Sequence, residues 1–312
     1  MKKCKLLSIL FIITLLSCQT KSNDKFTDTN SAGVIPIAVD VSFEPIIKEE
    51  IAVFESQFLE AQITPHFTNE INAIDLLMKD SVRVAIVTRP LSEKEINYLK
   101  EKKFSPRSYK LATDGIALII NISNPDTLIS VVDLKRILTG KAKNWNDIYP
   151  NSKLGTFKVV FDNPNSSTVR YAIDSICVDE KISQDLNAQS TNEEVINYVS
   201  KTKNAIGVIA VNWLDNAKDT TNLTFNSSIR VMSVSNQETA TTIDSYKPFQ
   251  AYLYYGNYPL SRSIYIILND PRGTLPSSFT NFMTSDRGQR IILKTGLVPA
   301  TQPVRIVSVK EE

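Results

Sequence analysis

Short apolar runs alternate along this chain with longer segments in which apolar residues recur every three or four positions. The runs cover residues 34–39, 82–87, 114–120, 157–161, 205–211 and 265–268. Their continuity is typical of strands buried on both faces. The longer segments predict helices in residues 43–58 and 71–78, from residue 92, in 131–138 and 169–177, from residue 191, and in 279–292. This alternation predicts an α/β architecture with mostly parallel sheets.

The N-terminus has a different pattern, in which a lysine-rich start precedes an apolar core at residues 6–16 and a small-residue end. This layout predicts a signal peptide in residues 1–17, because the apolar core is shorter than the roughly 20 residues of a permanent membrane helix. Leu15-Leu16-Ser17-Cys18 resembles the lipobox of bacterial lipoproteins, whose cysteine becomes the lipid-modified first residue. The resemblance implies lipidation of Cys18; the alternative is an ordinary cleaved signal with a chance cysteine.

The segment after the cysteine, residues 18–32, is polar and rich in small side chains. It predicts a flexible tether between a lipid anchor and the folded body. No later apolar run approaches the length of a membrane span. We therefore expect a protein of the cell envelope, anchored to a membrane by lipid, with its body in the periplasm or at the cell surface.

Composition and motifs argue against several classes of function. The 35 basic and 33 acidic residues give a net charge of +2, without the basic excess expected of a nucleic-acid-binding protein. The single histidine, His66, has no cysteine or carboxylate at metal-ligand spacing, and no P-loop, dinucleotide or Gly-x-Ser-x-Gly motif is present. Cys177 lies in an apolar run, which favours a core position. We expect no enzyme activity, metal or cofactor.

Hydroxyl side chains gather where predicted strands pass into helices. The loop from Asp162 to Thr168 carries Ser166, Ser167 and Thr168 before a predicted helix, and Ser42 stands at a similar junction. The first turn of a helix offers unpaired N–H groups and a positive dipole end, which suit an anion. The alternative interpretation is that these hydroxyls only cap their helices. Two such junctions that face each other would favour binding.

Five segments together resemble the phosphate-binding proteins of bacterial uptake systems, the PstS-type family of periplasmic solute-binding proteins. They are DGIALIINISNP (114–125), LKRILTGKAKNWNDI (134–148), TNEEVINYVSKTKNAIGVI (191–209), YPLSRSIYIILN (258–269) and FTNFMTSDRGQRIILKTGLVP (279–299). The resemblance begins near Val34 and follows the family's order over nearly the whole mature chain. The segment at 134–148, with its G-x-x-x-N-W pattern, is the most specific of the five.

The resemblance implies two α/β lobes, each a mostly parallel sheet flanked by helices, with a hinge of crossing strands. The expected boundaries are 33–113 and 255–312 for lobe 1 and 114–254 for lobe 2. It also implies a monomer that captures inorganic phosphate or a similar small anion between the lobes for an ABC-type membrane permease. The Ser42 junction and the loop 162–168 would then face each other.

At the expected ligand position the chain departs from the family pattern. The family loop reads roughly Arg-x-x-Gly-Ser-Gly-Thr; here Ser166 and Thr168 match its hydroxyls, whereas Asp162 replaces the arginine. Thr88 stands where the family has an aspartate, with Arg89 beside it. The remaining expected ligand-binding residues are Ser42, Ser167, Arg170 and Glu70, which falls near a family serine.

Two accounts of these charges remain open at this point. In the first, Arg89 takes over the role of the missing arginine and binds the anion. In the second, Arg89 pairs with Asp162 or Glu70 and the pocket serves a different solute or none. The second account would make the protein a same-fold envelope sensor or assembly protein.

Overall fold

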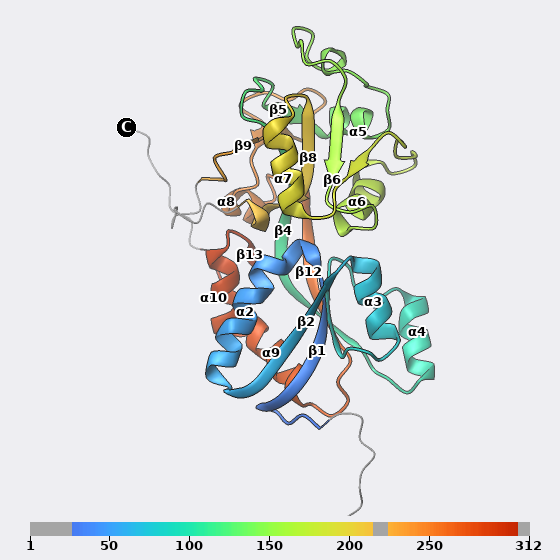
Figure 1. The fold of residues 1–312 in the computed structure, drawn as a ribbon, viewed down its shortest axis with the longest axis vertical. Coiled ribbons are helices and arrows are strands. Elements are labelled where there is room, and N and C mark those ends of the chain that lie inside the picture. Colours follow the sequence, from blue (N-terminus) through green and yellow to red (C-terminus); the bar gives the residue numbers. More distant parts are fainter. Residues whose placement is uncertain (1–26, 215–223, 305–312) are drawn as a thin grey trace, which may run out of the picture.

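The structure is a computed structural model that describes residues 27–214 and 224–304. The predicted signal peptide and Cys18 lie outside the described residues. Two α/β lobes lie one above the other and are joined by two long strands, β4 (Arg107–Asn121) and β12 (Ser261–Leu268), as Figure 1 shows. The expected two-lobed α/β fold is confirmed.

The first lobe is built on parallel strands in the order β2-β1-β3, with β12 and β4 beyond β3. Apolar side chains of α2, α9 and α10 cover one face of this sheet, and those of α3 and α4 cover the other. The elements are β1 (Ala32–Asp40), the 3₁₀ turn η1 (Val41–Phe43), α2 (Glu44–Gln57), β2 (Glu60–Thr68), α3 (Glu70–Met78), β3 (Val84–Val87), α4 (Glu93–Glu101), α9 (Leu275–Thr284), α10 (Asp286–Lys294) and β13 (Val298–Pro299).

The second lobe continues the same sheet from β4 through β8, β6 and β7, with β9 also paired to β4. A small second sheet joins β5, β10 and β11. The elements are β5 (Leu128–Ser130), α5 (Val131–Leu138), η2 (Trp145–Asp147), β6 (Lys158–Phe161), α6 (Ser167–Tyr171), the π-helical turn η3 (Ala172–Ile176), β7 (Asn187–Ala188), α7 (Asn192–Lys201), β8 (Ala205–Ala210), η4 (Val211–Trp213), β9 (Ile229–Val231), β10 (Ser233–Ser235), β11 (Ser245–Tyr246) and α8 (Gln250–Tyr254).

The crossing strands give the sheet its antiparallel pairs. β4 pairs with β12 along its first half and with β8 along its second half, antiparallel in both cases. Within the lobes, β1 runs parallel to β2 and β3, and β6 runs parallel to β7 and β8. The carboxyl ends of β1, β3 and β6 therefore point to the junction between the lobes, where parallel sheets commonly bind ligands.

Local patterns predicted several elements closely. Helix α5 has the expected bounds, the strand at 114–120 is the buried half of β4, and Cys177 is buried as expected. The folded body, however, begins earlier than expected. Asp28, which the sequence analysis placed in the tether, is buried against Arg83, with Oδ1 2.5 Å from Nη2.

Candidate functional site

The Ser42 junction folds differently from the sequence expectation. Asp40, at the end of β1, caps the turn η1 by accepting a hydrogen bond from the Ser42 N–H at 2.9 Å. Helix α2 then starts at Glu44, with Phe43 as its N-cap. The alternative interpretation, that Ser42 caps this helix, is therefore wrong. Because the hydroxyl of Ser42 is not used as a cap, it is available to reach the other lobe.

The Ser42 junction and the loop 162–168 meet between the lobes. Ser42 Oγ and Ser167 Oγ lie 3.3 Å apart, both buried. The Ser42 carbonyl also accepts hydrogen bonds from Asn212 Nδ2 and Trp213 Nε1, each at 2.9 Å. Both donors follow strand β8 of the second lobe. The structure thus places the two lobes in contact at the point where the sequence analysis expected the junctions to face each other.

Within the loop 162–168, the hydroxyls of Ser166 and Thr168 bind each other and other groups of the loop. Thr168 Oγ1 donates to Asp162 Oδ1 at 2.7 Å and lies 2.7 Å from Ser166 Oγ. Ser166 also caps α6 by accepting from the Val169 N–H at 3.3 Å. The capping interpretation therefore holds for Ser166. Asp162, which replaces the family arginine, uses one oxygen to fix Thr168; its buried Oδ2 has no partner among the described residues.

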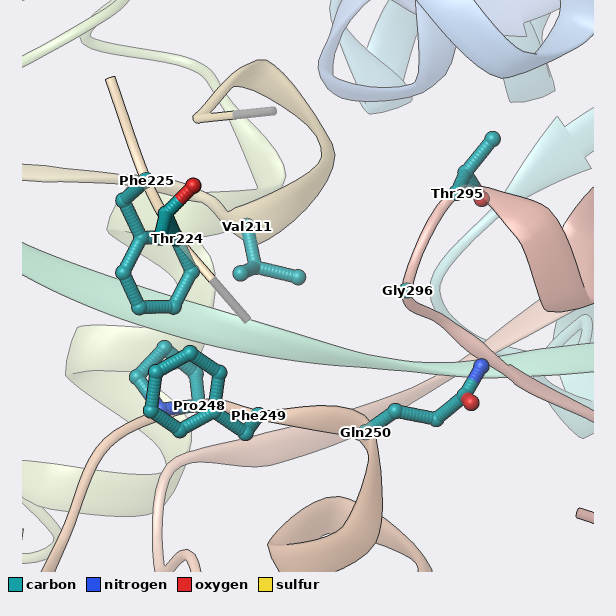
Figure 2. A pocket seen from close by; sticks show the side chains of 8 residues that line it. All are labelled: Val211, Thr224, Phe225, Pro248, Phe249, Gln250, Thr295 and Gly296. Carbon is teal, nitrogen blue, oxygen red and sulfur yellow. The ribbon is translucent and has the colours of Figure 1, made fainter. Parts of the chain in front are cut away.

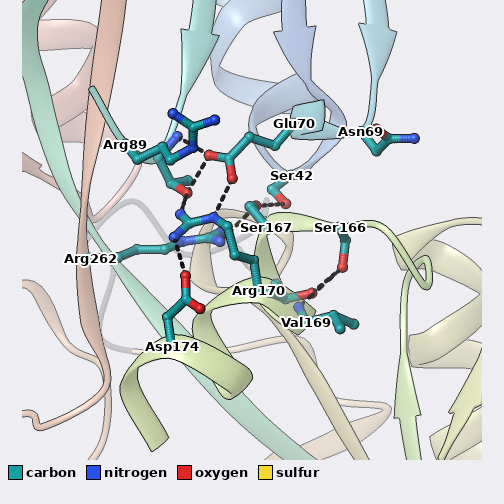
Figure 3. A network of polar contacts seen from close by, with 12 residues as sticks. Ser42, Asn69, Glu70, Arg89, Ser166, Ser167, Val169, Arg170, Asp174 and Arg262 are labelled. Atoms are coloured by element: carbon teal, nitrogen blue, oxygen red, sulfur yellow. Dashed lines mark hydrogen bonds and ion pairs between the residues drawn. The ribbon is translucent and has the colours of Figure 1, made fainter. Parts of the chain in front are cut away.

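A second cluster joins the lobes through Glu70, at the first turn of α3. The carboxylate accepts from the Thr88 N–H at 2.7 Å, from Thr88 Oγ1 at 2.6 Å and from Arg170 Nε at 2.5 Å. Arg170 Nη2 donates to Thr88 Oγ1 at 2.5 Å, and Nη1 donates to Asp174 at 3.1 Å. Figure 3 shows Arg170 reaching from α6 toward Glu70 on the other lobe.

Arg262 is the cation that the sequence analysis missed. It lies buried in β12, opposite Asp114 in β4, and its Nε donates to Asp114 Oδ2 at 2.9 Å. Nη1 donates to Ser167 Oγ at 2.8 Å, and the guanidinium lies 5.1 Å from the centre of the Phe43 ring. Nη2 is buried and unpartnered in the described parts of the chain. The sequence did contain a signal for this pair, because Asp114 and Arg262 are charged residues beside the apolar runs of two strands.

Arg89 pairs with a carboxylate that the sequence analysis did not consider. Its guanidinium makes two hydrogen bonds of 2.8 Å to the carboxylate of Glu95, one turn into α4. Glu95 also closes the capping box with Ser92, and its pKa falls to about 2 because of the bond from Arg89, against a smaller opposing effect of burial. The partner of Arg89 is thus neither Asp162 nor Glu70, and the cations at the lobe junction are Arg170 and Arg262.

The ionisation of the junction carboxylates follows from burial set against these arginines. Burial opposes the charge on Glu70, but the ion pair with Arg170 and the bonds from Thr88 outweigh it, so its pKa lies below the ordinary value. Burial raises the pKa of Asp40 to about 6, although the charge of Arg262 acts in the opposite direction. Burial likewise raises the pKa of Asp114. Of these three carboxylates, Glu70 is firmly ionised, whereas Asp40 and Asp114 accept a proton more readily.

The small cavity shown in Figure 2 lies elsewhere. It has a volume of about 20 Å³, which is room for about one water molecule. It is lined by Val211, Thr224, Phe225, Pro248, Phe249, Gln250, Thr295 and Gly296. None of the predicted site residues lines this cavity, and a volume of this size does not hold a solute such as phosphate.

Within residues 27–214 and 224–304, no group of three or more His, Cys, Asp or Glu side chains is placed to hold a metal ion. Among the helices in those ranges, none combines the length and apolar character that crossing a membrane requires.

Comparison with known proteins identifies the family of this fold. A profile of the PBP superfamily domain matches residues 26–287, most of the chain. The chain belongs to the PBP superfamily. The family of solute-binding proteins expected from the sequence is confirmed at this level.

Individual relatives agree with this assignment. The phosphate-binding protein PstS of Staphylococcus aureus strain USA300 is 27% identical over 213 residues, which cover 66% of this chain and 60% of the relative. The match thus spans about three fifths of that protein's length.

Solved structures share the fold at low identity. A substrate-binding protein assigned to a phosphate ABC transporter of Clostridium perfringens, with bound phosphate, superposes with a TM-score of 0.70 at 21% identity, covering 86% of this chain and all of that one. An ABC-type phosphate transport receptor from Vibrio cholerae gives a TM-score of 0.64 at 20% identity, with the same coverage of both chains.

Proposed function

We propose that this protein is an extracytoplasmic solute-binding protein of the PstS type that captures phosphate or a similar oxyanion between its lobes. The observation that carries the proposal is the set of hydrogen bonds that the Glu70 carboxylate accepts at the lobe junction. A backbone N–H, a hydroxyl and a guanidinium converge on this oxyanion from both lobes. Such charge-assisted donors are those that bind phosphate and carboxylate groups in proteins. The names of the relatives support phosphate as the first solute to test.

The remaining residues of the lobe junction would complete the contacts. In this proposal Arg170 and Arg262 provide the positive charge, and Ser42, Thr88 and Ser167 provide hydroxyls. Asp162 would hold Thr168 in place and leave one carboxylate oxygen to accept a hydrogen bond from the solute. The proposal assigns binding, not catalysis.

Isothermal titration of the purified protein with phosphate tests this function directly. We expect a saturable heat with phosphate and a weaker one with sulfate, which at neutral pH has no O–H group to donate a hydrogen bond to a carboxylate. A folded protein that gives no heat at millimolar phosphate contradicts the proposal. In a parallel thermal-shift screen, stabilisation by an uncharged sugar rather than by any anion would favour the alternative, a sensor for a different solute.

We further propose that Cys18 carries the lipid and that an ABC-type permease receives the solute. The lipobox-like sequence supports the first point, and the similarity to ABC-transport proteins of Clostridium perfringens and Vibrio cholerae supports the second. Replacing Cys18 by serine should move the protein from the membrane fraction to the soluble fraction of cells. If Cys18→Ser stays in the membrane fraction at the level of the unsubstituted protein, lipid on this cysteine is not the anchor.

A further inference from the structure

The Glu70 carboxylate is bound as a solute would be. Its side chain is buried and uses both oxygens, with Oε1 accepting two bonds from Thr88 and Oε2 accepting one from Arg170. The donors come from a strand end of the first lobe and a helix of the second. A free oxyanion entering this position would need the same donors, so it cannot bind beside Glu70 without sharing them.

The same contacts close the two lobes on each other. Arg170 belongs to α6 of the second lobe, while Glu70 and Thr88 belong to the first. Asp174, one turn after Arg170, also binds its guanidinium, with Oδ2 3.1 Å from Nη1. Most other ion pairs in the described parts of the chain stay within one lobe, as Asp75–Lys79 does on the same helix as Glu70. The Glu70–Arg170 pair is therefore positioned to govern lobe closure.

We propose that the Glu70 carboxylate is a built-in occupant of the solute position, which closes the lobes in the absence of solute and which an incoming oxyanion has to displace. The identity of that oxyanion rests on the proposed function; the closure does not. Glu70 would then determine specificity, because only an anion that binds the donors more strongly than Glu70 does could displace it.

Coulomb energy supports displacement over joint binding. A second anion ~4 Å from the ionised Glu70 would be repelled by about 4 kcal/mol at an effective dielectric constant of 20. Asp162 adds a further buried carboxylate at the junction, where Arg170 and Arg262 are the cations. Glu70 therefore has to leave Arg170 before an anion takes its place. A site whose competent form is populated to about one tenth or less shows an affinity reduced at least about tenfold.

The competing explanation is that the pair only stabilises the fold, as a static ion pair would. The two explanations differ in what removal of the carboxylate does. In the first, Glu70→Ala opens the lobes and increases affinity for the anion. In the second, Glu70→Ala lowers stability and leaves both the lobe geometry and the affinity unchanged.

Small-angle X-ray scattering in phosphate-free buffer and titration with phosphate separate these outcomes. The variants are Glu70→Ala and, from the other lobe, Arg170→Gln, which breaks the same contact if the first variant folds poorly. The matched control is Asp75→Ala, which removes an exposed carboxylate from the same helix. Circular dichroism confirms that each variant is folded.

We expect the unsubstituted protein and Asp75→Ala to be compact without phosphate, and Glu70→Ala and Arg170→Gln to be extended. We expect Glu70→Ala to become compact on adding phosphate and to bind it at least about tenfold more tightly than the unsubstituted protein does. If Glu70→Ala and Arg170→Gln are as compact as the control, the closure is overturned. If Glu70→Ala binds phosphate no more tightly, the displacement is overturned. If it opens but neither protein binds phosphate, the closure stands and phosphate is rejected as the solute.

Discussion

Two arginine clusters in this protein resemble each other in composition and differ in completeness. At the far end of the first lobe, Arg83 lies buried between Asp28 and Asp270, with Oδ1 of each carboxylate on the guanidinium. The second oxygens accept backbone N–H groups, Asp28 from Leu275 and Asp270 from Thr274. We call Asp28, Arg83 and Asp270 the lobe brace. Both of its carboxylates are fully used within one lobe.

The lobe junction leaves its polar atoms incompletely paired. One oxygen each of Asp40, Asp114 and Asp162, and Nη2 of Arg262, are buried without a partner among the residues described. Unpaired buried polar atoms cost free energy, and those that gather between two lobes are candidate contacts for a bound molecule. The comparison teaches that burial of charge alone does not mark a site. What distinguishes the junction from the lobe brace is the incomplete pairing across two lobes.

The largest effect that we expect is a loss of stability when the lobe brace is broken. Arg83→Met leaves two carboxylates buried without their cation, which should lower the free energy of unfolding by about 3–5 kcal/mol. Urea unfolding followed by circular dichroism measures this loss. Phosphate affinity of the folded fraction should not change, because the lobe brace does not reach the junction. A loss below about 1 kcal/mol would show that the brace is not the stabilising element we take it for.

The next effect is a pH dependence at the junction. Burial raises the pKa of Asp40 to about 6, above its unfolded value of 3.8, although Arg262 opposes the shift and Glu70 reinforces it. A raised pKa means that Asp40 contributes stability below pH 3.8 that is lost as pH rises through about 6. Asp40→Asn should therefore be more stable than the unsubstituted protein at pH 7, by up to the order of 3 kcal/mol, and equal to it near pH 3.5.

The difference between the two unfolding curves, measured from pH 3.5 to 8, isolates this one group. Glu70 titrates with the opposite sign, because its pKa is lowered and its stabilising charge is lost only in acid, but it is present in both proteins. Asn keeps an oxygen for the bond from the Ser42 N–H. A difference that is flat with pH would mean that Asp40 is not the group whose protonation the junction favours.

A smaller effect, on phosphate affinity, tests whether Arg262 binds the solute. Arg262→Lys keeps a positive charge for Asp114 but loses the planar fork that also reaches Ser167. Losing one hydrogen bond to a charged solute should weaken phosphate binding by about 1.5–3 kcal/mol, roughly tenfold to a hundredfold. Titration calorimetry measures the change, and unfolding confirms that the variant remains folded. Unchanged affinity would restrict Arg262 to bracing the crossing strands.

The sequence predicted the α/β architecture well because the apolar runs that build the strands are local and nearly uninterrupted, whereas the two-lobed arrangement was implied by the family resemblance. It also located the hydroxyls of the loop 162–168 and Ser42, since strand-to-helix junctions are visible in a single stretch of chain. It could not pair Arg262 with Asp114, which are 148 residues apart and meet only through the register of two crossing strands.

Arg89 illustrates the opposite limit. Its partner Glu95 is only six residues away, but the sequence shows Glu95 in the ordinary role of a first-turn helix residue. Whether Glu95 binds only the Ser92 cap or also turns toward Arg89 depends on how the chain bends at Pro90, which no pattern in the sequence specifies. The position of Arg89 just after a strand was thus easier to predict than the direction of its side chain.

The smallest effect that we expect concerns this pair, which is partly exposed and belongs to neither cluster. Arg89→Ala should lower the free energy of unfolding by only about 0.2–1 kcal/mol, as for other pairs in contact with solvent. It should weaken phosphate binding much less than Arg262→Lys does, because Arg89 is held by Glu95 and not by the junction. Titration of both variants under the same conditions makes the comparison. If Arg89→Ala weakens binding as much as Arg262→Lys, then Arg89 leaves Glu95 when solute enters, and the site includes the arginine that the sequence first indicated.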